Sequence, residues 1–117
     1  MTTSATRNGT KGERLIVNVL SPTWPLADRR AKQGAKDRGD IGGIAPGLVI
    51  EAKYAPKRYE ISEWLKEADR EGINDNADLA VVWFKLKGTD DPLKWPVMMR
   101  GRFFLPLLQL WTNDRRA

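Results

Sequence analysis

Cysteine and histidine are both absent from this chain of 117 residues. The absence of cysteine excludes disulfides, thiolate zinc sites and cysteine nucleophiles, and the absence of histidine removes the commonest general base and metal ligand. Any catalysis must therefore use carboxylates, lysine or hydroxyl groups. The sequence also has no apolar run near the roughly 20 residues that span a bilayer, so we expect a cytoplasmic protein with no membrane partner.

What the chain does contain is the composition of one folded domain with a basic surface. Hydrophobic residues make up 41% of the sequence and include five tryptophans, which is enough for a single core at this length. Residues 1–9 are small and polar and lack periodicity, so we expect a flexible basic arm followed by one domain over 10–117. The net charge of +5 favours an anionic partner such as nucleic acid.

Residues 39–53 are predicted to form a β-hairpin. Proline fixes the φ of the first central position of a type II turn and glycine tolerates the positive φ of the second, so Pro46-Gly47 is the expected reversal. A two-residue turn at this point places Asp40 opposite Lys53 in the neighbouring strand. The alternative is a bulge nearer the start of the hairpin, at the glycine pair that follows Ile41, which would shift the register by one residue.

This hairpin brings charged groups together. Side chains alternate along a strand, so Glu51 and Lys53 project from the same face, and the predicted register adds Asp40 to them. Burying unpaired charge costs several kcal/mol, so two carboxylates on an inward face require a partner. A hard divalent cation such as Mg²⁺ is one such partner. An ordinary hairpin with a surface Glu/Lys pair is the alternative.

The helix predicted before the hairpin carries a third carboxylate. Thr10-x-x-Glu13 is a capping-box pattern, and the apolar residues that follow recur at helical spacing, which predicts a helix over 11–20. Glu13 can cap this helix. It also lies on the same stripe as Ile16 and Leu20, which is the stripe expected to face the sheet.

The spacing D-x(10)-E-x-K, formed by Asp40, Glu51 and Lys53, resembles the active-site motif of the PD-(D/E)XK nuclease superfamily. The small Gly-Asp-Ile hairpin after an N-terminal helix is most similar to the archaeal and phage Holliday junction resolvases, although Gly39 stands where that family has proline. The resemblance is specific from Glu13 to Lys53 and only topological after that. It implies an α/β fold with a restriction-endonuclease-like core, in which a central mixed sheet of about five strands is flanked by helices.

The resemblance also implies a catalytic set. Asp40 and Glu51 would hold Mg²⁺ together with the carbonyl of Ala52, with Mn²⁺ as a substitute. Glu13 would support the metal directly or through water, and Lys53 would orient and polarise the attacking water. The carboxyl groups and the lysine would thus act together on a phosphodiester bond.

The remaining elements are assigned from apolar patterning. Helices are expected near 61–72 and 103–112, and strands at 27–33, 78–87 and 94–99. The strand within 78–87 is apolar enough to be buried on both faces, whereas the proline in 94–99 favours an edge position. Trp64 is expected in the core rather than as a base-stacking platform. The acidic side chains of its helix are expected to point away from DNA: Glu60, Glu63, Glu67 and Asp69.

Basic residues flank the proposed site on both sides in sequence. Neutralising backbone phosphates supplies most nonspecific affinity for DNA, so clustered cations beside a metal site predict a DNA-binding surface. The alternative is a solvated basic loop. The candidate DNA-binding residues are Arg29, Arg30, Lys32, Lys36, Arg38, Lys57 and Arg58.

These features predict a Mg²⁺-dependent endodeoxyribonuclease that resolves four-way DNA junctions as a homodimer, active in a host cytoplasm if a phage encodes it. A same-fold nuclease acting on linear DNA or ends is one alternative, and a noncatalytic DNA-binding accessory protein is another. The last quarter of the chain is rich in apolar residues, and some of them are expected to form the two-fold interface. The candidates are Trp95, Val97, Met98, Met99, Phe103, Phe104, Leu107, Leu110 and Trp111.

Overall fold

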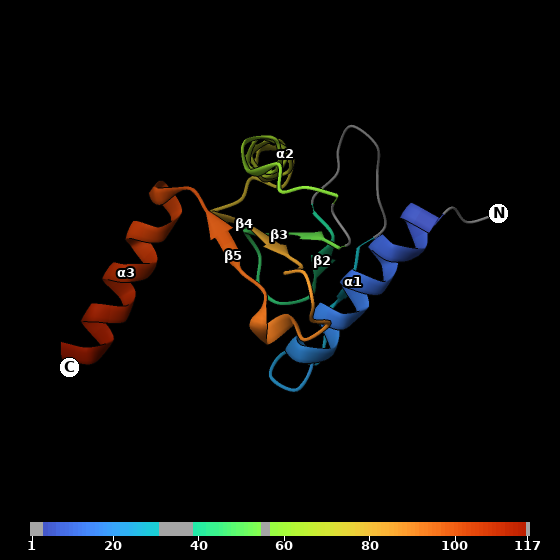
Figure 1. Ribbon diagram of the computed structural model, residues 1–117. Coiled ribbons are helices and arrows are strands. Elements are labelled where there is room, and N and C mark those ends of the chain that lie inside the picture. The colour runs from blue at the N-terminus through green and yellow to red at the C-terminus, as the bar shows by residue number, and fades with distance from the viewer. Residues whose placement is uncertain (1–3, 31–38, 55–56, 117) are drawn as a thin grey trace.

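The structure, a computed structural model, describes residues 4–30, 39–54 and 57–116 (Figure 1). Five strands form one sheet in the order β1-β2-β3-β4-β5; β3 and β4 run parallel and the other neighbours antiparallel. This confirms the predicted α/β class with a five-stranded mixed sheet. The elements are α1 (Ser4–Leu20), β1 (Asp28–Arg29), β2 (Ile41–Gly42), β3 (Leu48–Lys53), α2 (Ile61–Asn74), β4 (Leu79–Phe84), the 3-10 turn η2 (Pro92–Lys94), β5 (Val97–Met99) and α3 (Gly101–Arg116).

Helices α1 and α2 cover opposite faces of the sheet. On one face, Ile16 of α1 belongs to a buried cluster with Ile50 of β3. On the other face, Trp64 of α2 packs with Val49 of β3 and Val82 of β4. Because side chains alternate along a strand, consecutive residues of β3 contribute to the two cores in turn. Trp64 is therefore a core residue, as expected.

β3 and β4 are the two long strands in the interior of the sheet, and their sequences explain why. Each is covered by a helix on at least one face, and β4 reads Leu-Ala-Val-Val-Trp-Phe with most positions buried. Such a run is typical of a strand with both faces covered. β5, which follows Pro96, pairs only with β4 and lies at the sheet edge, as predicted.

α1 begins earlier than the sequence indicated. It starts at Ser4, so residues 4–9 are helical and not a flexible arm, and Thr10 lies inside the helix instead of capping it. The hydroxyl of Thr10 accepts a hydrogen bond from Arg29 at 3.2 Å. No proline interrupts this segment. Residues 4–9 lack apolar periodicity because the first turns of α1 extend beyond the strands, where the helix has no sheet to pack against (Figure 1).

The turn between β2 and β3 is longer than the two residues predicted. Gly47 has φ +78°, as its place after Pro46 in a type II turn requires. Gly43 also has a positive φ, +83°, and a Cβ there would clash with the carbonyl of Leu26. The chain therefore leaves the ladder at Gly43, where only glycine fits, and a loop rather than a two-residue turn joins the strands.

This longer loop moves the register of the hairpin by two residues. Ile41 pairs with Ile50, and the amide of Asp40 donates to the carbonyl of Ile50 at 2.9 Å. The prediction that Asp40 lies opposite Lys53 is therefore wrong, and Asp40 is instead level with Glu51. A shift of two residues preserves which face each side chain points to, so the predicted convergence survives the change.

Three other boundaries differ from the sequence pattern. β1 covers Asp28–Arg29 of the expected strand 27–33, whose later residues lie outside the described part. α2 continues through Gly72 to Asn74, and α3 spans Gly101–Arg116. α3 projects away from the sheet (Figure 1). Among the described residues, no helix is long and apolar enough to cross a membrane.

Candidate metal centre

Glu51 and Lys53 lie on the face of β3 that α2 covers. Side chains alternate along a strand, so both point to the same face as Val49, which packs against Trp64. Glu51 is only 1% exposed. A carboxylate is thus buried in the middle of an apolar strand, where its desolvation is costly unless another group compensates it.

α2 adds two more carboxylates to this position. Glu67 and Glu71 follow Trp64 by three and seven residues, and Ala68 lies between them on the same stripe, so all four point toward the sheet. One carboxylate oxygen from each of Glu51, Glu67 and Glu71 lies within 4.8 Å of the others. These three residues, the glutamate triad, could hold a metal ion.

The glutamate triad was only partly visible in the sequence. The sequence pattern assigns Glu67 to the acidic face of α2 opposite the apolar stripe, which is wrong, since Glu67 lies with Glu51 and Lys53, and it does not single out Glu71. The signal was present in the spacing, because both residues fall on the helical stripe that Trp64 and Ala68 define. Apolar patterning missed it because it assigns charged residues to the solvent face.

Lys53 contacts two members of the triad. Its Nζ donates to Oε1 and Oε2 of Glu67 at 2.7 and 2.9 Å, and lies 3.5 Å from Oε1 of Glu51. The lysine side chain is 23% exposed, so it lies at the edge of the buried cluster. Glu67 therefore holds the ammonium group beside Glu51.

Asp40, the residue before β2, also reaches the cluster. Its Oδ2 accepts a hydrogen bond from the amide of Ala52 at 2.8 Å, which fixes the carboxylate across the hairpin from Glu51. Asp40 is 2% exposed, and its charge acts on Glu51. The structure thus brings together three of the predicted catalytic residues: Asp40, Glu51 and Lys53.

The environment of the cluster shifts the pKa values of Glu51 and Lys53. Burial raises the pKa of Glu51 well above its ordinary value of 4.5, and a hydrogen bond with Glu71 and the charges of Asp40, Glu71 and Glu67 raise it further. For Lys53, burial alone would lower the pKa, but the hydrogen bond to Glu67 and the neighbouring carboxylates outweigh it and raise the pKa. Lys53 therefore stays protonated at neutral pH.

The donor set fits a hard divalent cation. Oε2 of Glu51 is buried, and no N–H or hydroxyl donor of the described residues reaches it. Asp40 and the glutamate triad bring four carboxyl groups together, and Lys53 contacts two of them, Glu51 and Glu67. Carboxylate oxygens are the ligands that Mg²⁺ and Mn²⁺ prefer, and a cation would relieve the repulsion that raises the pKa of Glu51.

Glu13 lies elsewhere. It is buried on α1, which covers the face of the sheet opposite to Glu51, and its Oε2 is 3.7 Å from Nε of Arg29. A role for Glu13 at the metal stays a prediction.

The candidate DNA-binding residues are partly engaged within the chain. Arg29 pairs with Glu13, Arg30 lies 3.3 Å from Asp75, and Arg58 lies 3.2 Å from Glu60. Lys57 is exposed. The remaining three candidates, Lys32, Lys36 and Arg38, lie outside the described residues.

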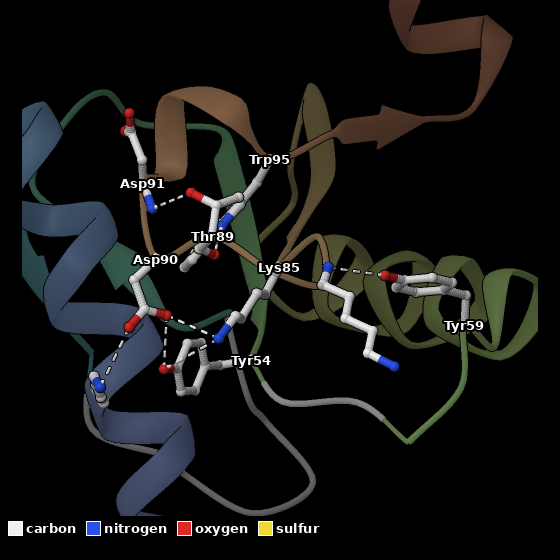
Figure 2. Close-up of polar contacts among 9 residues, drawn as sticks. Tyr54, Tyr59, Lys85, Thr89, Asp90, Asp91 and Trp95 are labelled. Carbon is white, nitrogen blue, oxygen red and sulfur yellow. Dashed lines mark hydrogen bonds and ion pairs between the residues drawn. The ribbon is translucent and has the colours of Figure 1, made fainter.

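A second polar cluster begins at the residue after Lys53. Figure 2 shows Tyr54, Lys85 and Asp90 pointing toward one another. The hydroxyl of Tyr54 donates to Asp90 at 2.8 Å, and Asp90 also lies 2.8 Å from Nζ of Lys85 and 3.4 Å from Nζ of Lys11. The amide of Lys85 donates to the carbonyl of Lys53 at 2.8 Å. These contacts hold the end of β3, and with it Lys53, against β4 and α1.

No family model, curated protein or solved structure matches this chain. The likeness to PD-(D/E)XK nucleases therefore stays a prediction based on the motif of Asp40, Glu51 and Lys53. The carboxylate cluster is a property of the structure and does not depend on any relative.

Proposed function

We propose that this protein hydrolyses phosphodiester bonds of DNA with the help of a divalent cation, Mg²⁺ with Mn²⁺ as a substitute. The observation that carries the proposal is the buried carboxylate of Glu51, which lies among the carboxylates of Asp40, Glu67 and Glu71 with Lys53 beside it. Burying several carboxyl groups side by side costs free energy. A cation site explains why this chain places Glu51 in a core strand.

Each side chain then has a role. Glu51, the two glutamates of α2 and Asp40 would hold the cation. Bound there, the cation would stabilise the negative charge that develops on the scissile phosphate. Protonated Lys53, positioned by Glu67, is suited to donate a hydrogen bond to a phosphate oxygen or to orient the attacking water, but not to act as a general base.

DNA is the substrate that the composition favours. The net charge of +5 attracts a polyanion, while the carboxylate cluster would repel it unless a cation were bound. A four-way junction is the specific substrate we propose, because the hairpin motif resembles that of junction resolvases. Linear DNA is the alternative within the same chemistry.

The test compares cleavage of a labelled four-way junction and a matched linear duplex, with Mg²⁺ or with EDTA. We expect cleavage only with the metal, and a loss of at least about 100-fold in Glu51→Gln, because a metal ligand supplies several kcal/mol of transition-state stabilisation. Glu63→Gln is the matched control, since Glu63 is an exposed residue of α2 whose side chain pairs with Lys66.

The outcomes separate the alternatives. Full activity of Glu51→Gln, or equal cleavage in EDTA, would contradict the proposed centre. Metal-dependent cleavage of the linear duplex alone would retain the chemistry and exclude the junction as substrate. Binding to DNA without cleavage under any condition would favour the accessory-protein alternative.

A further inference from the structure

Among the described residues, the contacts that attach helix α3 to the domain lie near its first turn. Phe103 packs against the core under α2, and Arg100 and Arg102 each lie 3.0 Å from Asp69 of α2. Beyond this base the helix extends away from the sheet (Figure 1). Its direction is therefore set by the contacts at this end.

The projecting part of α3 exposes large apolar side chains. Phe104 is 52% exposed, Trp111 is 58% exposed, and the four leucines between them range from 36% to 67%. Together they leave on the order of 600 Å² of apolar surface in water, the upper end of what a monomeric protein exposes in one patch. The four leucines are Leu105, Leu107, Leu108 and Leu110.

The order of these residues is symmetric. Phe104, Leu107, Leu108 and Trp111 are spaced by three, one and three residues, so they form one stripe of an α-helix, and Gln109 lies away from that stripe. Read from either end, the stripe runs aromatic, leucine, leucine, aromatic. A two-fold interface needs such a self-complementary surface, because the same patch must contact itself after rotation.

We infer that α3 is the interface with a second copy of this chain, and that the two α3 helices pair antiparallel. The two-fold axis passes between Leu107 and Leu108. Phe104 then lies beside the partner's Trp111, and Leu107 lies beside the partner's Leu108. No charged residue occupies the stripe from 104 to 111.

The area of the stripe is consistent with a weak dimer. Leu105 and Leu110 flank the stripe, so its four side chains expose on the order of 400 Å² per copy, and two stripes bury about 800 Å² in total, the size of a weak and transient interface. The dimer should therefore form at tens of micromolar and dissociate on dilution. It would carry two copies of the candidate metal centre, but the interface does not depend on the proposed cleavage and is tested without DNA.

Sedimentation of the wild-type chain from about 1 to 100 μM should show a concentration-dependent dimer, because the interface has the area of a modest association. Leu108→Glu places a charge next to the two-fold axis and should leave a monomer throughout this range. Gln109→Glu introduces the same charge off the stripe and should dimerise as wild type. Helix content and Tm should match in all three, since these side chains lie outside the core. A wild-type monomer at 100 μM, or a Leu108→Glu dimer, overturns the inference.

Disulfide crosslinking tests the antiparallel arrangement. The chain has no cysteine, so Phe104→Cys and Trp111→Cys each introduce a single thiol. Mild oxidation of the mixed variants should give a linked heterodimer, because the antiparallel pair brings these positions together within the reach of a disulfide. Each variant alone should stay unlinked. Efficient linkage of Phe104→Cys to itself would indicate a parallel pair and overturn the model of the interface.

Discussion

The end of β3 carries two charged clusters on opposite faces of the sheet, and they are built differently. Lys53 points into the cluster under α2, where Glu51 is almost fully buried. Tyr54, the next residue, points toward α1 and the exposed cluster around Asp90 (Figure 2). In the exposed cluster one carboxylate meets two ammonium groups, whereas in the buried cluster Lys53 contacts two of four carboxyl groups that lie together.

The pKa directions reflect this difference. A hydrogen bond from Lys85, and then one from Tyr54, lowers the pKa of Asp90 to about 2. Burial and neighbouring carboxylates raise the pKa of Glu51 instead. The exposed cluster is thus complete within the chain. In the buried cluster the raised pKa of Glu51 shows that its carboxyl group favours a proton or a bound cation, which is why we propose the metal site there.

Replacing the two lysines gives the largest expected contrast. Lys53→Ala should slow DNA cleavage by about 100-fold while Mg²⁺ binding persists, because Lys53 positions a reacting group without being a metal ligand. Lys53→Arg should not restore the rate, since a planar fork cannot replace a compact ammonium. Lys85→Ala, in the exposed cluster around Asp90, should cleave DNA at nearly the wild-type rate.

Single-turnover cleavage at saturating Mg²⁺ measures these rates, and calorimetric titration with Mg²⁺ measures binding. Equal rates in Lys53→Ala and Lys85→Ala would show that the two clusters do not differ in function.

Neutralising the buried carboxylate should have opposite effects on stability and on metal response. In EDTA at neutral pH, Glu51→Gln should raise the free energy of unfolding by about 1–3 kcal/mol, because glutamine is neutral without the proton that Glu51, with its raised pKa, takes up on folding. Mg²⁺ at 100 times its Kd should stabilise the wild type by about 2.7 kcal/mol and the variant far less.

Asp90→Asn is the matched control in the exposed cluster. It should lower stability slightly and leave the Mg²⁺ response unchanged. Urea denaturation in EDTA and in Mg²⁺ measures both quantities, and a Glu51→Gln variant that still responds fully to Mg²⁺ would remove Glu51 from the site.

The pH dependence of stability should have opposite signs for the two clusters. Glu51 has a higher pKa in the folded state than its ordinary 4.5, so its contribution to stability is complete below pH 4.5 and is lost as the pH rises toward the folded pKa. Asp90 has a lower folded pKa, about 2 against 3.8, so its contribution is present above pH 3.8 and is lost as the pH falls through 2.

Metal-free protein should therefore become less stable between pH 5 and pH 9. Glu51→Gln should flatten this decline, and Asp90→Asn should leave it in place but weaken the dependence below pH 4. Urea midpoints in EDTA across this range measure the effect. A decline that persists in Glu51→Gln would assign it to another group.

Local patterning in the sequence was enough to predict the α/β class, the buried strand β4, the edge position of β5 and the positive φ of Gly47. It also placed Glu51 and Lys53 on one face, because alternation along a strand is a property of the backbone alone. These features depend on neighbours in the chain, so no other part of the molecule is needed to derive them.

Only the tertiary structure decided which groups meet Glu51. The register of Asp40 depends on the close approach of Gly43 to Leu26, and the positions of Glu67 and Glu71 depend on how α2 lies across β3. The direction of α3 is set by its contacts with α2. Each of these is a contact between segments distant in sequence, and local periodicity carries no information about how two such segments are placed.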